Sequence, residues 1–362
     1  MKIGCAVARL LGCAVVALSV QAADFAGAVP FVAGDGSGGF VVSYIANDSF
    51  RFVTIRGDVV SAPREIAKGN LLVNRADFPS IAVSGKSMAA TWSTRNGHGA
   101  MVHVAKSGDG GVTWTKASSP HPSLVSEFGF VSLTPGGDAV WLDGRELKGG
   151  HEGEGDMQLR FASLPFASET TLDARVCDCC QTAMAMTSSG PVIAYRDRSN
   201  EEIRDIAVMR RTSSGWSAPK IVHADGWKMA GCPVNGPQLD ASGQRVAIAW
   251  FTAAHQQPRV YAAFSNDGGA TFAAPIRVDV EKAAGRVDLA LLANGSAAVT
   301  WVEQRGEKSL LFARRVSQSG AAGKVVEIGE ARGFPRIAVS KENIGLVWTA
   351  GERVHFRTIN LP

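Results

Sequence analysis

The sequence predicts an all-β fold, a β-propeller of six or seven blades in which each blade is a four-stranded antiparallel sheet. Three observations lead to this prediction. An eight-residue segment with turn chemistry occurs twice, at 107–114 and at 265–272. Short apolar stretches bounded by Gly, Asn and Ser recur about every 45–55 residues, and none of them shows a convincing helical period. Repeats of four short strands are typical of propeller blades.

The repeated eight-residue segment reads Ser-x-Asp-x-Gly-x-Thr followed by an aromatic residue. Its Asp can accept hydrogen bonds from nearby backbone N–H groups, and its Gly tolerates a positive φ, so the segment predicts a tight turn between two strands. The aromatic residue then enters the next strand. The positions concerned are Ser107, Asp109, Gly111 and Trp114 in the first copy and Ser265, Asp267, Gly269 and Phe272 in the second.

Seven segments follow one order of strands. The first strand is short and apolar and often follows Pro or Gly, and we expect it at 30–33, 78–82, 128–132, 181–185, 237–240, 287–290 and 334–338. The second strand has an aromatic residue near its end, and we expect it at 41–44, 89–92, 139–141, 192–195, 246–250, 298–301 and 345–348. The third strand is expected at 101–104, 159–162, 205–208, 260–264, 310–313 and 354–357.

The aromatic side chains that end the second strands are expected in the core, packed between blades. They include Trp92, Trp141, Trp250, Trp301 and Trp348. The seventh segment lacks a clear fourth strand, so part of the N-terminal segment is expected to complete that blade and close the ring. The sequence leaves the number of blades open between six and seven.

One face of a propeller gathers the connections into the first strands and the loops between the second and third strands, and sites are expected on such loops. In this chain those segments hold many arginines, several carboxylates and four cysteines. An arginine-rich mouth favours an anionic small molecule or glycan, because the guanidinium group pairs bidentately with a carboxylate. The candidate ligand-binding arginines are Arg75, Arg145, Arg196, Arg198, Arg286 and Arg336.

The repeated segment resembles the Asp-box of sialidases and related propellers, also called the BNR repeat. Together with 177–182, 194–199, 202–205 and 231–237, it makes most of the chain similar to an exported bacterial family of sialidase-like proteins. The resemblance implies six blades and an exo-sialidase-like glycoside hydrolase, with an arginine triad for the substrate carboxylate, a Tyr–Glu nucleophile pair and an Asp acid/base. The implied catalytic residues here are Tyr195, Glu202 and Asp77. The alternative for Tyr195 is an inter-blade aromatic equivalent to Trp250.

Four cysteines remain after the N-terminal segment, namely Cys177, Cys179, Cys180 and Cys232, and they lie in the connections into two consecutive blades. Their even number suits an oxidising compartment, so we expect one or two disulfides, with Cys179 or Cys180 linked to Cys232. A copper or zinc site and a redox-active thiol pair are the alternatives. A second interpretation of function is therefore a non-catalytic binding or metal-handling propeller organised around these cysteines. No cofactor is otherwise assigned.

Residues 1–22 are predicted to be a secretory signal peptide, because Lys2 and Arg9 precede an apolar run at 10–20 and a small-x-Ala cleavage site. A lipoprotein attached at Cys13 is the alternative. We expect a periplasmic or secreted monomer with one propeller domain at 23–362. The 362-residue chain has a formal net charge of +4 and no basic tract, so no nucleic-acid partner is expected. No other apolar segment reaches the roughly 18 residues that a membrane span needs.

Overall fold

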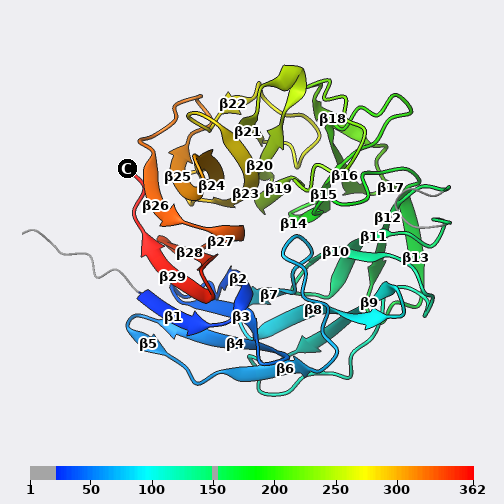
Figure 1. Ribbon diagram of the computed structural model, residues 1–362, viewed down its shortest axis with the longest axis vertical. Helices are drawn as coiled ribbons and strands as arrows, with labels where there is room; N and C mark the ends of the chain where they lie inside the picture. The colour runs from blue at the N-terminus through cyan, green and yellow to red at the C-terminus, as the bar shows by residue number, and fades with distance from the viewer. Residues whose placement is uncertain (1–21, 149–153) are drawn as a thin grey trace, which may run out of the picture.

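The structure, a computed structural model, describes residues 22–148 and 154–362. Within these ranges the strands form seven antiparallel sheets, and Figure 1 shows them arranged as blades of a ring around a central channel. The predicted propeller is confirmed, and the number of blades is seven. The signal peptide, except for Ala22, and the alternative lipid attachment at Cys13 lie outside the described residues. No helix in the described ranges is long and apolar enough to cross a membrane.

We number the blades 1 to 7 by the chain order of their innermost strands. The innermost strands are β2 (Ala28–Gly34), β7 (Ser80–Ser84), β10 (Phe128–Leu133), β14 (Ala183–Thr187), β19 (Gln238–Ser242), β23 (Ala283–Leu291) and β27 (Arg332–Ser340). The second strands are β3 (Phe40–Ala46), β8 (Ser87–Asn96), β11 (Asp138–Asp143), β15 (Gly190–Arg196), β20 (Arg245–Thr252), β24 (Ala297–Arg305) and β28 (Asn343–Ala350).

The third strands are β4 (Ser49–Arg56), β9 (Gly99–Ser107), β12 (Gln158–Ser163), β16 (Ile206–Thr212), β21 (Arg259–Ser265), β25 (Lys308–Val316) and β29 (Arg353–Ile359). The outer strands are β5 (Val59–Val60), β6 (Arg64–Lys68), β13 (Glu169–Asp173), β17 (Gly215–Trp216), β18 (Lys220–His223), β22 (Ile276–Arg277), β26 (Val326–Glu330) and β1 (Ala22–Ala26). Blade 2 has three named strands and an isolated bridge between Val104 and Ser118 at its outer edge. A short 3-10 helix, η1 (Ala254–Gln256), lies in the β20–β21 loop.

The second strands are the most deeply buried, because each is covered on both faces by a neighbouring blade. Their side chains therefore form continuous apolar runs rather than an alternating pattern, as β20 and β24 show. Trp141, Trp250 and Trp301 are fully buried between blades, as predicted. Each of their indole N–H groups donates to a carboxylate at 2.8–2.9 Å, so burial of these rings leaves no polar atom unsatisfied.

The ring is closed by the N-terminal strand, as the sequence predicts. β1 pairs antiparallel with β29 and becomes the outer strand of blade 7. Figure 1 shows β1 at the blue end of the chain beside β29 at the red end. Asp24 of β1 accepts hydrogen bonds from Arg357 at 2.7 Å and His355 at 2.9 Å. The first and the last described strands thus contribute to one sheet, and β29 is not left as an edge strand.

The two Asp-box segments form the same hydrogen-bonded turn. In the first copy Asp109 accepts from the Ser107 hydroxyl at 2.7 Å and from the Thr113 hydroxyl at 2.6 Å. In the second copy Asp267 accepts from Ser265 and Thr271 at the same two distances. Trp114 packs edge-on against Phe52 of blade 1, and Phe272 packs against the core between blades 4 and 5.

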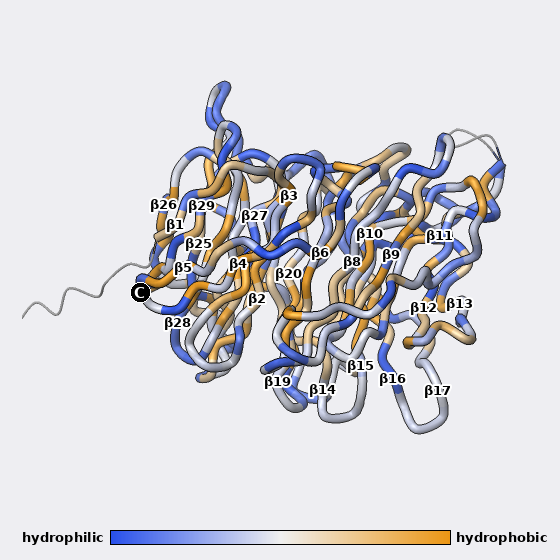
Figure 2. Tube along the Cα trace, turned by 90° about the horizontal axis from the view of Figure 1, so that it is seen from below, coloured by the Kyte–Doolittle hydropathy of each residue, from blue (hydrophilic) through white to orange (hydrophobic). Residues whose placement is uncertain are grey.

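Both turns lie on the face of the ring opposite the channel mouth. Gly110 donates its N–H to Lys86 in the β7–β8 turn, and Gly268 donates to Gln244 in the β19–β20 turn. Turns between first and second strands project from the lower edge in Figure 2, where the disc is seen from the side. The opposite face of the ring holds the connections into the first strands, and we call it the mouth face.

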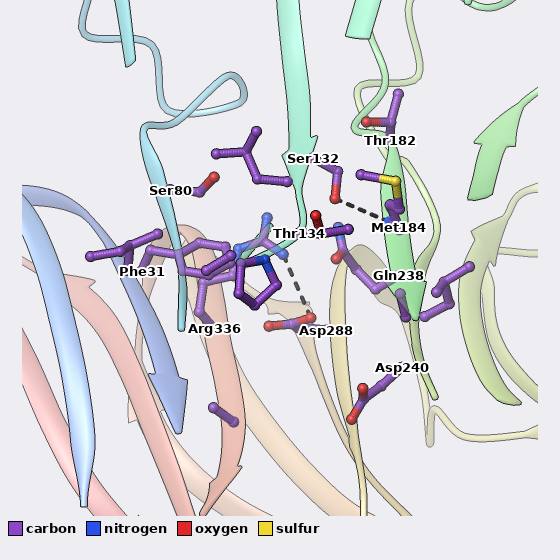
Figure 3. A pocket seen from close by; sticks show the side chains of 18 of the residues that line it. Phe31, Ser80, Ser132, Thr134, Thr182, Met184, Gln238, Asp240, Asp288 and Arg336 are labelled. Carbon is purple, nitrogen blue, oxygen red and sulfur yellow. Dashed lines mark hydrogen bonds and ion pairs between the residues drawn. The ribbon is translucent and has the colours of Figure 1, made fainter. Parts of the chain in front are cut away.

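Polar side chains on the inner strands, or just before them, connect neighbouring blades around the channel. Asp77 accepts a hydrogen bond from the N–H of Phe130 at 2.7 Å, Asp240 from Leu291 at 2.8 Å and Asp288 from Ile337 at 2.9 Å. The Ser132 hydroxyl accepts from Met184 at 3.0 Å, which Figure 3 shows. Burial raises the pKa of Asp77 to about 7 and that of Asp288 to about 6. The contribution of these carboxyl groups to the stability of the fold therefore depends on pH.

Asp267→Ala should lower the free energy of unfolding by about 1–2 kcal/mol, because the Thr271 and Ser265 donors lose their acceptor. Slight burial acts to raise the pKa of Asp267, but the hydrogen bonds from Thr271 and Ser265 lower it to about 2. The stabilisation is therefore present above about pH 4 and is lost as the pH falls toward 2. Denaturant unfolding measures it, with Asn266→Ala as the control. Equal stability of the two variants would contradict the prediction.

Asp77→Asn should flatten the dependence of stability on pH. Because the folded-state pKa of Asp77 is raised from 3.8 to about 7, the native protein binds a proton that the unfolded chain has released between these values. Wild-type stability should thus fall as the pH rises from about 4 to 7, by on the order of 1 kcal/mol or more for this group. Asn keeps an oxygen acceptor for Phe130.

The control for that experiment is Asp24→Asn, because the hydrogen bond from Arg357 is the main cause of a lowered pKa at Asp24. Its effect on the pH profile should lie below about pH 4. A profile for Asp77→Asn that is as steep between pH 4 and 7 as the wild-type profile would overturn the assignment.

Candidate functional site

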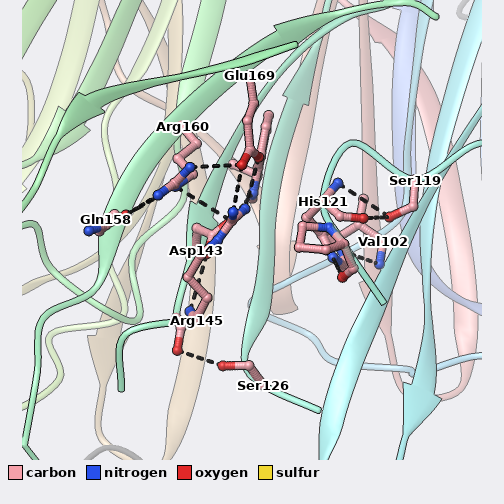
Figure 4. Close-up of polar contacts among 12 residues, drawn as sticks. Val102, Ser119, His121, Ser126, Asp143, Arg145, Gln158, Arg160 and Glu169 are labelled. Atoms are coloured by element: carbon pink, nitrogen blue, oxygen red, sulfur yellow. Dashed lines mark hydrogen bonds and ion pairs between the residues drawn. The ribbon is translucent and has the colours of Figure 1, made fainter. Parts of the chain in front are cut away.

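Arg145, the predicted arginine on blade 3, forms ion pairs within the protein. Arg145 follows β11 and donates to Asp143 at 2.6 and 2.7 Å and to Glu169 at 2.8 Å. Arg160 donates to the same Glu169 carboxylate at 2.8 Å, and Figure 4 shows the four side chains as one network. Hydrogen bonds to the two carboxylates raise the pKa of Arg145. Two guanidinium groups and two carboxylates balance each other here, which leaves little charge for a ligand.

Arg196, at the end of β15, is buried, and its side chain is used to hold neighbouring segments together. Its side chain is 1% exposed and stacks on Trp227 at 4.8 Å. Its donors reach the carbonyl oxygens of Asn235 at 2.6 and 2.9 Å, of Phe251 at 2.7 Å and of Arg204. This guanidinium joins blade 4 to the connection into blade 5 and has no free donor for a bound molecule.

Tyr195 and Glu202, two of the predicted catalytic residues, do not pair with each other by hydrogen bonding. The Tyr195 side chain is 1% exposed between blades 3 and 4, and its hydroxyl donates to Asp173 at 2.6 Å. Burial raises the pKa of Tyr195, and the Asp173 charge adds to the effect. Glu202 accepts from Arg198 at 3.0 Å and from Arg204 at 2.6 Å. The proposed roles of both residues in catalysis stay predictions.

The four cysteines gather where blades 4 and 5 begin. The Cys177 sulfur lies 3.4 Å from that of Cys180 and 3.9 Å from that of Cys179, and all three residues are buried. Cys232 is exposed, and its sulfur lies 3.9 Å from Asp178 Oδ1. The expected disulfides are not formed, since a bonded pair of sulfurs is about 2.05 Å apart and these four thiols are free.

The thiols of the cysteine cluster shift one another's pKa. Side-chain contacts with Cys179 and Cys180 hold the pKa of Cys177 well below its usual value. The same interaction with Cys177 raises the pKa of Cys179, while burial raises that of Cys180. The buried guanidinium of Arg204 lies nearby, with its Nη1 3.8 Å from Asp178. Thiolates of this kind are nucleophiles and ligands for soft metal ions.

Arg336 lies in the central channel, a cavity of about 780 Å³ that Asp77, Asp240 and Asp288 also line. Its guanidinium is 1% exposed, stacks on Phe78 at 3.9 Å and approaches Asp288 Oδ1 at 3.6 Å. Figure 3 shows it between Phe31 and Asp288. Its Nε and Nη2 have no hydrogen-bond partner. Burial lowers the pKa of Arg336. A cation with unused donors thus lies at the wall of the channel.

A second cavity, of about 670 Å³, opens on the mouth face between blades 1 and 7; we call it the seam pocket. Strand ends and turns from both sides of the ring closure line it, namely Phe25–Pro30, Tyr44–Asp48, Arg51, Arg75, Phe78, Arg332–Phe334, Thr349, Gly351 and Glu352. Arg51, Arg75 and Arg332 form no ion pair among the described residues, and Arg51 Nε is buried without a hydrogen-bond partner.

Arg286 adds a further positive charge beside the seam pocket. Its Nη1 lies 3.5 Å from the carbonyl oxygen of Gly333, which lines the pocket. Burial lowers the pKa of Arg286, and repulsion by Arg75 adds to the effect. Its backbone has a φ of 55° at an irregularity of β23 and is held there by a hydrogen bond from its N–H to Asn235 at 2.7 Å. Such strained backbone often occurs at sites.

The structure thus divides the predicted arginines into two groups. Arg75, Arg286 and Arg336 lie at or beside the seam pocket and the channel below it. Arg145, Arg196 and Arg198 lie on blades 3 and 4 and have internal partners. Sequence reasoning missed Arg51 because it lies inside a third strand, β4, just after the mouth loop. It also missed Phe25, because only the closing strand β1 brings this ring to the mouth.

The sequence matches no protein-family model and no curated protein sequence. Solved structures do match. The structure of an ulvan lyase from polysaccharide lyase family PL25 is similar with a TM-score of 0.57 and 10% identity, over 93% of this chain and 94% of that one. The same lyase bound to -[GlcA(1-4)Rha3S]- gives a TM-score of 0.54 at 10% identity with equal coverage. A triple mutant of AofleA from Arthrobotrys oligospora gives 0.51 at 12% identity, over 86% of this chain and 91% of that one.

At these identities the similarities show a shared fold and nothing finer. They agree with the ring of blades described above. They do not single out a sialidase, and the seven blades depart from the six that the sialidase resemblance implies. The chain is therefore a seven-bladed β-propeller whose mouth face holds a cationic seam pocket between blades 1 and 7 and a cluster of four thiols where blades 4 and 5 begin.

Proposed function

We propose that the protein binds an anionic glycan in the seam pocket. The observation that supports this most directly is that Arg51, Arg75 and Arg332 line one cavity and none of them has an ion-pair partner among the described residues. Guanidinium groups that the protein leaves unpaired in a concave site are suited to bidentate binding of a carboxylate or sulfate. Arg286, beside the pocket, adds to the positive electrostatic potential there.

The shape and the aromatic content of the pocket favour a sugar over a small inorganic anion. Phe25, Phe78 and Phe334 line it and are only partly buried, so parts of their surfaces stay open to the cavity. Apolar ring faces combined with a few polar groups are typical of small-molecule sites, and a sugar ring offers a matching apolar face and hydroxyls. A volume of about 670 Å³ accommodates a short oligosaccharide rather than a single ion.

The structural neighbours support this class of ligand without naming it. The ulvan lyase was solved with -[GlcA(1-4)Rha3S]-, a saccharide that carries a carboxylate and a sulfate. We propose the same general class for this chain, an oligosaccharide with at least one uronate, sialate or sulfate group. Sialic acid belongs to this class, and the sialidase resemblance makes it one of the first ligands to examine.

Hydrolysis of the glycan is the finer part of the proposal. Asp48 and Glu352 line the seam pocket, and neither forms an ion pair in the described part of the chain. A pair of carboxyl groups is what glycoside hydrolysis most often uses. Asp77, one of the predicted catalytic residues, lies next to Phe78 but faces the channel, while Tyr195 and Glu202 lie on blade 4. Binding, rather than turnover, is the part that the geometry supports best.

Arg75→Ala and Arg332→Ala should each weaken binding of an anionic oligosaccharide by about 10- to 100-fold, because each removes a charge-assisted contact of about 1.5–3 kcal/mol. Isothermal titration with uronate- and sulfate-bearing oligosaccharides measures the loss, and a neutral oligosaccharide of equal length should bind far more weakly. Affinity should also fall with added salt.

Arg95→Ala is the matched control, because Arg95 is an exposed arginine in β8 and does not line the pocket. It should bind as the wild type does. If the double variant of Arg75 and Arg332 kept wild-type affinity, or if charged and neutral oligosaccharides bound alike, the proposal would fail. Release of product from a fluorogenic sialoside, lost in Glu352→Gln, would support hydrolysis; binding without release would limit the function to recognition.

A further inference from the structure

We propose that Cys177, Cys179 and Cys180, with Cys232 as an outer fourth ligand, form a binding site for a thiophilic d10 cation, either Cu(I) or Zn(II). The site shares no lining residue with the seam pocket: it lies where blades 4 and 5 begin, whereas the seam pocket lies between blades 1 and 7 (Figure 1).

The sulfur positions fit a metal centre better than bonded pairs. The three buried sulfurs lie within 4.8 Å of one another, with measured separations of 3.4 and 3.9 Å from Cys177. With metal–sulfur bonds of about 2.3 Å, the ligand sulfurs of a tetrahedral or trigonal ion lie roughly 3.8–4.0 Å apart. Cys179 also lies within 4.8 Å of the Cys232 sulfur and Asp178, so it connects the buried trio to the exposed thiol.

The backbone that carries the trio is held on both sides. Cys177 donates its N–H to the carbonyl oxygen of Arg196 at 3.0 Å. On the other side, Gln181 donates to the carbonyl oxygen of Ala76 at 2.6 Å and accepts from Gly236 at 2.8 Å. Phe130 and Val234 pack against the three sulfurs and exclude water. Ligands on a braced, dry loop need little rearrangement to bind an ion.

The charges around the cluster provide the second, independent observation. Arg204 is 2% exposed, and its Nε and Nη1 have no hydrogen-bond partner, although its Nη2 donates to Glu202 at 2.6 Å. Glu202 at 2.6 Å and Asp178 at 3.8 Å already give this guanidinium negative charge, but the hydrogens on Nε and Nη1 still lack an acceptor. Sulfur ligands beside them would supply one, because a buried donor is stabilised by a negatively charged acceptor. Three thiolates on Cu(I), or four on Zn(II), carry a net charge of −2, which the buried Arg196 and Arg204 would help to stabilise.

Soft thiolate ligands select soft cations, which is why Ca²⁺ or Mg²⁺ does not fit this site. Each coordinating thiol releases its proton to solvent when the ion binds, so affinity should rise with pH. The exposed Cys232 and the adjacent Asp178 provide the side from which an ion arrives. Disulfides from Cys177 to Cys180 and from Cys179 to Cys232 are the competing outcome, because they would use the same four sulfurs.

The test is metal titration of the full chain, reduced and kept free of oxygen, with Zn(II) and separately with Cu(I) against a competing chelator. We expect one equivalent to bind and to raise the melting temperature. Cys180→Ser should lower the affinity at least about 100-fold, since it removes a buried ligand, and Cys232→Ser about tenfold, since the buried trio remains. Thiolate-to-metal charge-transfer absorption with Cu(I) should disappear in Cys180→Ser. A higher affinity for one ion in the competition decides between the two.

Arg75→Ala is the control variant and should keep full metal affinity, whereas Cys180→Ser should keep binding of the anionic glycan. The two proposals therefore fail separately. The thermal shift of the wild-type protein tests the proposal even if a cysteine variant folds poorly. Uptake of less than one equivalent by the reduced wild type would overturn it. So would protein isolated from the periplasm with all four thiols unreactive before reduction, reactive after it, and no metal bound.

Discussion

The ring depends on the pairing of β1 with β29. A propeller blade is stable only when both of its faces are covered by neighbours, so the last blade has to meet the first. Here blade 7 receives its outer strand from the opposite end of the described chain, and Asp24 adds an ion pair to Arg357 and a hydrogen bond to His355 across the joint. The seam pocket is a product of that closure, because Phe25 and Ala26 of β1 form one wall and the start of β27 forms another.

The mouth face carries many arginines, but their surroundings give them two different roles. On blades 3 and 4 each guanidinium meets carboxylates or carbonyl oxygens, as Arg145 and Arg196 do. These interactions join loops and neighbouring blades and leave few donors free. At the seam, Arg51, Arg75 and Arg332 face a cavity without such partners. The difference between a structural and a binding arginine is thus decided by which acceptors the fold places within reach, and not by the residue type.

The two candidate sites use opposite chemistry at different blades of one ring. The seam pocket offers positive charge and aromatic surface in an open cavity, whereas the cysteine cluster offers soft anionic ligands in a closed one. A rigid propeller suits this arrangement, because each loop is fixed by its own blade and a site between two blades does not disturb a site between two others. Carboxyls on the inner strands or just before them, namely Asp240, Asp288 and Asp77, support that rigidity by accepting hydrogen bonds from the next blade.

The sequence by itself determined the class of fold, the turns at Asp109 and Asp267, the buried tryptophans and the strand that closes the ring. All of these follow from local chemistry. Short apolar strands alternate with turn residues at fixed spacing, and an aromatic side chain stands at the end of each second strand. It also indicated that Cys177, Cys179, Cys180 and Cys232 would be neighbours, because they precede consecutive blades.

Only the tertiary structure decided the number of blades, the state of the thiols and the division of the arginines. The number of blades depends on how far each sheet turns from the next, which no local motif encodes. Whether Arg145 or Arg332 is free depends on carboxylates brought near by distant segments, such as Glu169 beside Arg145. The Asp-box turns, although they mark the repeat most clearly, lie on the face away from both candidate sites, because the third strand of every blade ends there.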